Sequence, residues 1–132
     1  MEDWKIKIAV LWLIYDVAGL AAVALMFMEP CVLAELVEEG TIEGLQMGPE
    51  MLLVGAVLLL VPLVMAFLSL ILKDSSNRWA NIIAGIVFIG LGVTDLPTYV
   101  AKPSAYAILM WLSTIVATVL IVWYALKSKP KA

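Results

Sequence analysis

Carboxylates inside apolar stretches are the residues of this sequence best placed to do chemistry. Asp16 lies in the middle of the apolar run from Ile8 to Met28, and Asp95 lies near the end of a later one. About 20 apolar residues make a helix that crosses a bilayer. A carboxylate at the centre of such a helix costs about 2.5–3.5 kcal/mol on insertion scales. Asp16 could therefore join helices, carry protons, or meet a cation supplied by another chain.

A set of polar, aromatic and small residues accompanies Asp95. These residues recur at alternating spacings of four and three, which places them on one face of a helix: Asn81, Gly85, Phe88, Gly92, Asp95 and Tyr99. Glycines allow helices to approach closely, and polar side chains can hydrogen-bond across the contact. We interpret this face either as a helix-packing seam or as the wall of a polar cavity lined by Asp95 and Tyr99.

The depth of Asp16 limits what can hold it. At a rise of about 1.5 Å per residue, its level in the membrane meets Pro62 and the segment from Thr114 to Thr118. No Lys or Arg is expected at that depth, so we expect Asp16 to be largely protonated and to face the bundle interior. Its preferred partners are the hydroxyl of Thr114 or Thr118, and then the Leu58 carbonyl that Pro62 leaves without a donor.

Several kinds of chemistry have no support in the sequence. There is no histidine and only one cysteine, Cys31. An intramolecular disulfide and His-ligated metal or haem are therefore excluded. We find no glycine-rich phosphate loop and no nucleophile paired with a base. We accordingly expect no catalytic residue, no metal site, no cofactor and no nucleic-acid partner.

The composition is that of an integral membrane protein. The chain has 132 residues, of which 64% are hydrophobic and 14% charged, against about 45–50% and 25% in soluble domains. Hydropathy predicts a single all-α domain, residues 1–132, with spans at about 8–28, 51–72, 80–98 and 104–126. We therefore predict a four-transmembrane-helix bundle, whose first span is not a cleaved signal peptide.

Charge predicts how the bundle sits in the bilayer. Seven of the eight basic residues fall in the N-terminus, the loop between spans two and three, and the C-terminal tail, and only Lys102 falls on the other side. The positive-inside rule then places both termini in the cytoplasm. The opposite side carries the acidic segment 29–50, which we interpret either as a solvated loop that helps to set topology or as a cation-attracting vestibule. Within it, Pro30 to Glu39 should form a short amphipathic helix at the outer surface, capped by Gly40.

Arg78 and Trp79 mark the cytoplasmic start of span three. An arginine and a tryptophan at this level suit an interface anchor. Ser76 or Asn77 could cap the helix. The local sequence Asn77-Arg-Trp-Ala-Asn81 is also fairly specific to one protein family.

That segment, with Gly48-Pro-Glu-Met-Leu-Leu53 and Ile121-Val-Trp-Tyr-Ala125, resembles a family of four-span prokaryotic membrane proteins, domain of unknown function 6326. The resemblance covers nearly the whole chain. It implies a four-helix membrane fold in a prokaryotic plasma membrane and no assigned activity. The family's acidic residue in span one falls near Val23 here, so Asp16 is off that pattern. A looser likeness to DoxX-type proteins concerns the fold alone.

From these observations we predict a non-enzymatic membrane component, an accessory or structural subunit of a membrane assembly. Besides the lipid bilayer, its expected partners are further copies of itself or other membrane subunits, because the chain is too small to enclose a large cavity alone. The alternative is a small transporter or channel that uses Asp16 as a protonatable group, with Asp95 and Tyr99 lining its path. A membrane enzyme is the third hypothesis.

Overall fold

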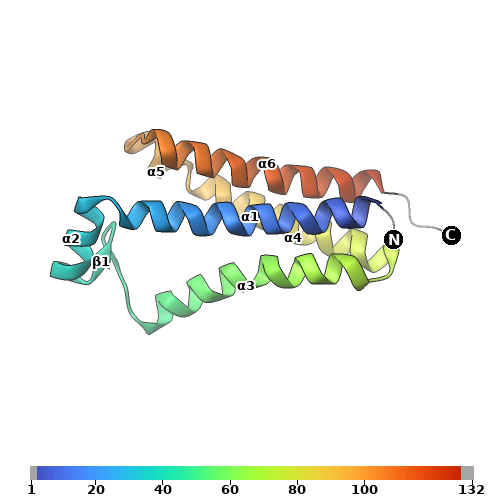
Figure 1. Cartoon of the computed structure of the whole chain (residues 1–132), viewed down its shortest axis with the longest axis horizontal. Helices are drawn as coiled ribbons and strands as arrows, with labels where there is room; N and C mark the ends of the chain where they lie inside the picture. The colour runs from blue at the N-terminus through green and yellow to red at the C-terminus, as the bar shows by residue number, and fades with distance from the viewer. Residues whose placement is uncertain (1–2, 129–132) are drawn as a thin grey trace.

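Four long helices dominate the computed structural model, which describes residues 3–128 (Figure 1). The elements in chain order are α1 (Asp3–Phe27), α2 (Pro30–Glu39), β1 (Thr41–Ile42), β2 (Leu45–Gln46), α3 (Pro49–Ile71), α4 (Asp74–Thr94), α5 (Leu96–Ala101) and α6 (Ala105–Lys127). The predicted all-α fold, with a short helix between the first two spans, is therefore confirmed.

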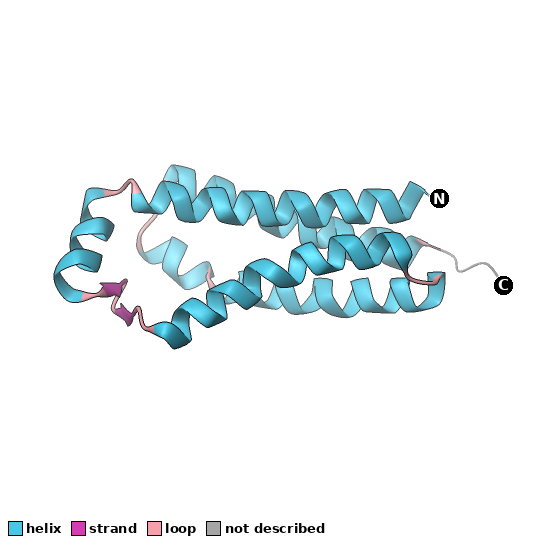
Figure 2. Ribbon diagram, turned by 60° about the horizontal axis from the view of Figure 1, so that its bottom comes forward, coloured by secondary structure: helices cyan, strands magenta, loops and turns pink. Residues whose placement is uncertain are grey.

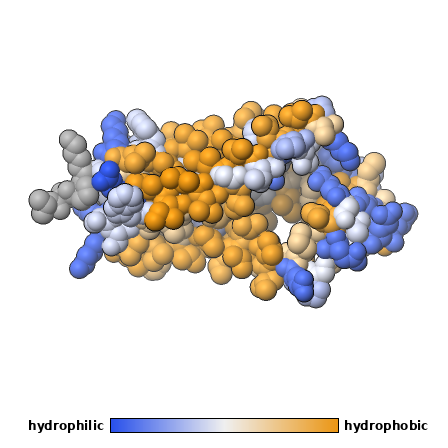
Figure 3. All heavy atoms as spheres, turned by 180° about the vertical axis from the view of Figure 1, so that it is seen from behind, coloured by the Kyte–Doolittle hydropathy of each residue, from blue (hydrophilic) through white to orange (hydrophobic). Residues whose placement is uncertain are grey.

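Four segments are long and apolar enough to cross a membrane: α1, α3, α6, and α4 taken together with α5. Their outward side chains are mostly large and hydrophobic. On the face drawn in Figure 3 they form a broad apolar belt, with polar residues gathered at both ends. A soluble protein rarely exposes an apolar patch larger than a few hundred Å². The chain is a four-span membrane protein.

The helices pack unevenly. α1 packs extensively against α6 and α3, and α4 packs against α6, whereas α3 and α4 touch very little. Both chain ends lie at one end of the bundle, which we call the terminal end (Figure 1). We call the opposite end, which carries α2, the β-hairpin and α5, the hairpin end.

The core occupies the terminal half of the bundle. Its largest buried apolar side chains come from all four spans: Ile8, Trp12, Met65, Ile82, Phe88 and Ile121. In α3, residues 49–60 include no buried side chain. This half of α3 diverges from the other helices toward the hairpin end (Figures 1 and 2). The bundle is thus tightly packed at one end and open at the other.

The third span differs from its expected bounds. α4 begins at Asp74, because the five polar residues 74–78 that precede the apolar run are also helical. The predicted cap at Ser76 or Asn77 is therefore wrong, and Asn77 is a buried residue inside the helix. At the other end α4 stops at Thr94, and Pro97 occupies the first turn of the separate helix α5, a position that proline favours.

The segment after α1 combines one confirmed prediction with one missed element. α2 spans Pro30–Glu39 and ends on Gly40, whose φ of 67° is the left-handed conformation that glycine adopts readily. The antiparallel hairpin of β1 and β2, with Thr41 opposite Gln46, was not predicted. Its two-residue turn has positive φ at both Glu43 and Gly44, as in a type I′ turn.

Candidate functional site

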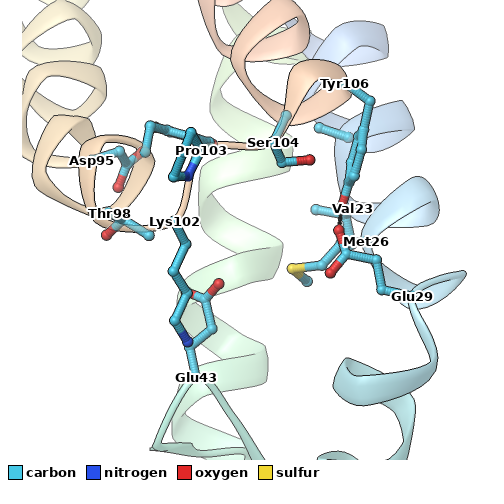
Figure 4. Close-up of a pocket in the computed structure, with 13 residues that line it drawn as sticks. Val23, Met26, Glu29, Glu43, Asp95, Thr98, Lys102, Pro103, Ser104 and Tyr106 are labelled. Atoms are coloured by element: carbon cyan, nitrogen blue, oxygen red, sulfur yellow. Dashed lines mark hydrogen bonds between the residues drawn. The ribbon is translucent and has the colours of Figure 1, made fainter.

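A cavity of about 470 Å³, which we call the mouth cavity, lies at the hairpin end. It is enclosed by the end of α1, the β-hairpin, α5 and the start of α6 (Figure 4). Its polar lining consists mainly of Glu29, Glu43, Asp95, Tyr99, Lys102 and Tyr106. Its volume is within the range of ligand pockets, about 300–1,000 Å³.

The mouth cavity carries an excess of acidic groups. Three carboxylates, those of Glu29, Glu43 and Asp95, share it with one ammonium group, that of Lys102. Glu29 accepts a hydrogen bond from the hydroxyl of Tyr106, which ties the end of α1 to the start of α6. Within residues 3–128, no ion pair joins Lys102 to these carboxylates. The cavity therefore presents net negative charge to an entering solute.

Glu35 positions the hairpin that carries Glu43. One carboxylate oxygen of Glu35, on α2, accepts hydrogen bonds from the Thr41 hydroxyl at 2.8 Å and from the Gly44 amide at 2.9 Å. These donors, with the Gly44 amide first, hold the pKa of Glu35 below its usual range. The resulting clamp fixes the turn, and Glu43 takes a φ of 52° there.

A second, smaller cavity of about 210 Å³ extends into the bundle, and we call it the inner cavity. Rings from three helices line it, those of Tyr15, Phe88 and Trp111, together with Leu58, Thr114 and Asp95. Asp95 lines both cavities. The Tyr99 ring of the mouth cavity also lies 5.5 Å from the Trp111 ring of the inner cavity. The two cavities therefore adjoin each other.

Gly92 on α4 allows Trp111 and Ile115 of α6 to lie close to the α4 backbone. The indole nitrogen of Trp111 donates to the Gly92 carbonyl at 2.8 Å, and a Cβ on Gly92 would collide with the side chain of Ile115. The predicted inward face of α4 is thus a packing seam along most of its length. At its hairpin end, Asp95 and Tyr99 line a cavity, so both interpretations hold for different parts of the same face.

A buried polar network closes the terminal half. The Trp12 indole donates to Asn81 Oδ1 at 2.7 Å, and the Ser69 hydroxyl donates to the same oxygen at 3.1 Å. Asn77 Nδ2 in turn donates to the Ser69 carbonyl at 2.6 Å. All four side chains are fully buried. Asn81, which the sequence placed on a polar face, therefore links α1, α3 and α4 and lies outside both cavities.

Asp16 has no partner of the predicted kind. Its Oδ1 is covered and makes no hydrogen bond within the described residues. The Thr114 hydroxyl donates to the Trp111 carbonyl at 2.7 Å, and Thr118 donates to the Thr114 and Ile115 carbonyls. The predicted bonds from Asp16 to these threonines or to the Leu58 carbonyl are therefore wrong.

The position of Asp16 on α1 shows which way it faces. Lys5, Ala9, Trp12 and Asp16 form one helical stripe at spacings of four, three and four. Lys5, at the base of this stripe, donates to the Leu72 carbonyl at the end of α3. Because Ala9 and Trp12 on this stripe are buried, Asp16 lies on an inward-facing stripe of α1, and it lines neither cavity.

Arg78 and Trp79 lie at the terminal end. The Arg78 guanidinium donates to the carbonyls of Ala125 at 3.1 Å and Leu126 at 3.4 Å. It therefore caps the last turn of α6 and joins it to α4. The Trp79 side chain is 58% exposed, as expected of an aromatic residue at a membrane interface.

Glu29 and Glu43 belong to the acidic segment for which a cation-attracting vestibule was one interpretation. The sequence prediction missed the other cavity residues Tyr15, Lys102, Tyr106 and Trp111. Glu29 and Tyr106 are 77 positions apart, so no local spacing could pair them. One signal was available. Glu29 and Tyr106 lie at the ends of two apolar runs, and those ends are predicted to lie on the same side of the membrane.

The fold and the cavities define a four-span helical membrane protein with a polar, partly enclosed site at one end. A family model matches residues 2–131, and the chain belongs to this family of unknown function (DUF6326). This confirms the resemblance noted in the sequence. Searches of curated proteins and of solved structures found no match, so the likeness to DoxX-type proteins gains no support from them.

Proposed function

We propose that this protein is a small transporter that admits a cationic solute through the mouth cavity. The observation that carries the proposal is the cavity itself, about 470 Å³ in volume and lined by three carboxylates against one ammonium group. A cleft with one sign of charge and low-dielectric walls raises the local concentration of an oppositely charged solute. This makes Asp95 and Tyr99 solute-contacting residues, as the transport hypothesis expected.

The difference between the two ends supports transport over simple surface binding. The mouth cavity adjoins the inner cavity at Asp95, whereas the terminal half is filled by the core and by the Trp12–Asn81–Ser69–Asn77 network. A site within the bundle that is open at one end and closed at the other is what one state of an alternating-access carrier requires.

The charges support an orientation with the hairpin end outside. Lys5, Lys7, Lys73, Arg78 and Lys127 belong to the terminal end, which the positive-inside rule assigns to the cytoplasm. The proposed location is a prokaryotic plasma membrane with both chain termini inside the cell. The mouth cavity would then take its solute from the external medium.

Transport can be tested in proteoliposomes with tetramethylammonium, the simplest permanent organic cation. We expect time-dependent uptake that Glu43→Gln reduces at least severalfold, because the substitution removes one of three carboxylates that attract the cation. Glu38→Gln is the matched control, since Glu38 lies on α2 and lines neither cavity. Uptake no faster than in protein-free liposomes, or equal loss in both variants, would contradict the proposal.

A second candidate, the accessory or structural subunit, is favoured by Asp16. Its Oδ1 is covered and unpartnered, and an unsatisfied polar group within the membrane is costly. The residue as a whole is only partly buried, so a helix of another subunit or of a second copy could donate to the other oxygen of the carboxyl group. Native mass spectrometry after gentle extraction should then find a stoichiometric complex that Asp16→Ala disrupts and Asp16→Asn retains. A monomer in every detergent and nanodisc would count against this role.

A further inference from the structure

We infer that the solute is an amphiphilic cation whose aromatic ring occupies the inner cavity while its charged head lies in the mouth cavity. The inference rests on the transport proposal and extends it to a class of substrate. It is carried by the two cavities together, because their linings differ in chemistry and they meet at Asp95.

The inner cavity fits one aromatic ring in size and in chemistry. Its volume is about 210 Å³, and an apolar engineered cavity of about 150 Å³ in another protein binds benzene. Tyr15 and Phe88 pack edge to face, with ring centroids 5.3 Å apart. Together with Trp111 they offer three aromatic surfaces to a bound ring, which prefers such edge and offset contacts.

The adjoining part of the mouth cavity fits a positive head group. Asp95 stands between the two cavities, and Glu43 projects from the hairpin toward Lys102 and α5 (Figure 4). Tyr99 adds an aromatic face beside Asp95, and aromatic faces attract cations. A molecule with a ring joined through one carbon atom to an ammonium group would therefore satisfy both linings at once.

The splayed half of α3 supports an amphiphile over a purely water-soluble ion. Leu58, from that half, lines the inner cavity, yet residues 49–60 include no buried side chain and α3 scarcely touches α4. The side of the inner cavity formed by α3 is therefore loosely packed against the rest of the bundle (Figure 2). A ring that partitions into the bilayer can reach the cavity past α3.

The test compares three probes by titration calorimetry on the full chain in nanodiscs. Benzyltrimethylammonium carries both ring and charge, tetramethylammonium carries the charge alone, and neopentylbenzene is the uncharged isostere of the first. We expect benzyltrimethylammonium to bind about tenfold more tightly than either of the other two, after correction for binding to empty nanodiscs.

Two variants assign the ring to the inner cavity. Leu58→Trp should fill that cavity, so that benzyltrimethylammonium binds no better than tetramethylammonium. Leu60→Trp is the matched control, because Leu60 is on the same half of α3, is exposed and lines neither cavity. Full affinity of both cations in both variants would overturn the placement of the ring.

The outcomes separate this inference from the transport proposal. If tetramethylammonium binds in a Glu43-dependent manner and the benzyl group adds nothing, the inference fails and the transport proposal survives. If neopentylbenzene binds as tightly as its charged isostere, the cationic class is wrong. If neither cation binds, both proposals are overturned.

Discussion

Gly85 shows how a single residue sets the approach of two helices. A Cβ at this position would lie 2.5 Å from Cγ2 of Val122 on α6, so any side chain must push the two helices apart or move the valine. The alternating pattern of α4 placed Gly85 on a packing face, and the structure confirms it. The pattern could not name Val122, because contacts between helices depend on relative rotation and height.

We expect Gly85→Ala to destabilise the fold by about 1–3 kcal/mol, the usual cost of an added methyl group in a packed seam. Val122→Ala in the same chain should recover much of the loss. The free energy of unfolding in detergent micelles is the measurement. Gly90→Ala, on the same helix with no atom within 4 Å of the added Cβ, should be neutral or mildly stabilising. Equal destabilisation by both substitutions would contradict a specific role for the contact between Gly85 and Val122.

Asn81 is the residue on which the closed terminal half depends. Its Oδ1 accepts from both Trp12 and Ser69, and its Nδ2 donates to Asn77. Asn81→Leu would leave the Trp12 indole N–H and Asn77 Oδ1 without these partners, whereas the Ser69 hydroxyl would keep its bond to the Met65 carbonyl at 2.7 Å. We therefore expect a loss of about 1–3 kcal/mol of stability. Ile83→Leu, on the lipid-facing side of the same helix, is the control. A stability loss no larger than that of the control would mean that the network contributes little.

The hydrogen-bond partners of Asp16 could not be predicted from the sequence. Depth estimated from the sequence suggested Thr114 and Thr118 as its partners, and both hydroxyls donate to carbonyls of their own helix. Serine and threonine in helices commonly make this local bond. That local bond leaves the hydroxyl oxygen free to accept, so it does not explain why Asp16 makes no bond to these threonines. A matching height along the bundle does not fix the direction in which each side chain points around its helix, and the hydrogen-bond partners proposed for Asp16 were therefore wrong.

At the scale of elements, the long helices were predictable and the hairpin was not. Sustained hydropathy marks a span without any knowledge of its neighbours, and Pro30 and Gly40 mark the ends of α2. The strands of the hairpin have only two residues each, too few to show an alternating pattern. What holds this hairpin is the carboxylate of Glu35, which belongs to a different element.

The Glu35 clamp predicts a pH-dependent hairpin. Because the pKa of Glu35 is lowered in the folded protein, its carboxylate stabilises the hairpin above the pKa it has when unfolded. That contribution is lost as pH falls through the lowered pKa. We expect the hydrogen-exchange protection factor of the Gly44 amide to be constant from pH 8 to 6 and to fall in acid. Glu35→Ala should lose this protection at every pH, whereas Glu38→Ala should behave like the unmodified chain. Protection that is independent of pH would contradict the clamp.

At the scale of the whole molecule, two unlike ends share one apolar belt. The terminal end joins helices by buried polar bonds and by the ion pair of Lys5 with Asp74 at 2.6 Å. The hairpin end has few buried side chains and holds both cavities. Hydropathy predicted the apolar belt, and charge predicted that the two ends of the bundle differ. The cavities depend on how α3 diverges and on how α1, α5 and the hairpin meet, which are tertiary features that no local pattern encodes.

The chain's own cysteine can be used to test which end of the bundle faces out of the cell. Cys31 is exposed on α2 at the hairpin end and is the only cysteine in the sequence. If the hairpin end faces outward, a membrane-impermeant maleimide should label Cys31 in intact cells. The control is Cys31→Ala with Ser76→Cys, which moves the thiol to an exposed site at the terminal end, and this variant should be labelled only after permeabilisation. The opposite pattern would reverse the orientation. The mouth cavity would then face the cytoplasm, and a transporter in this state would collect its solute from inside the cell.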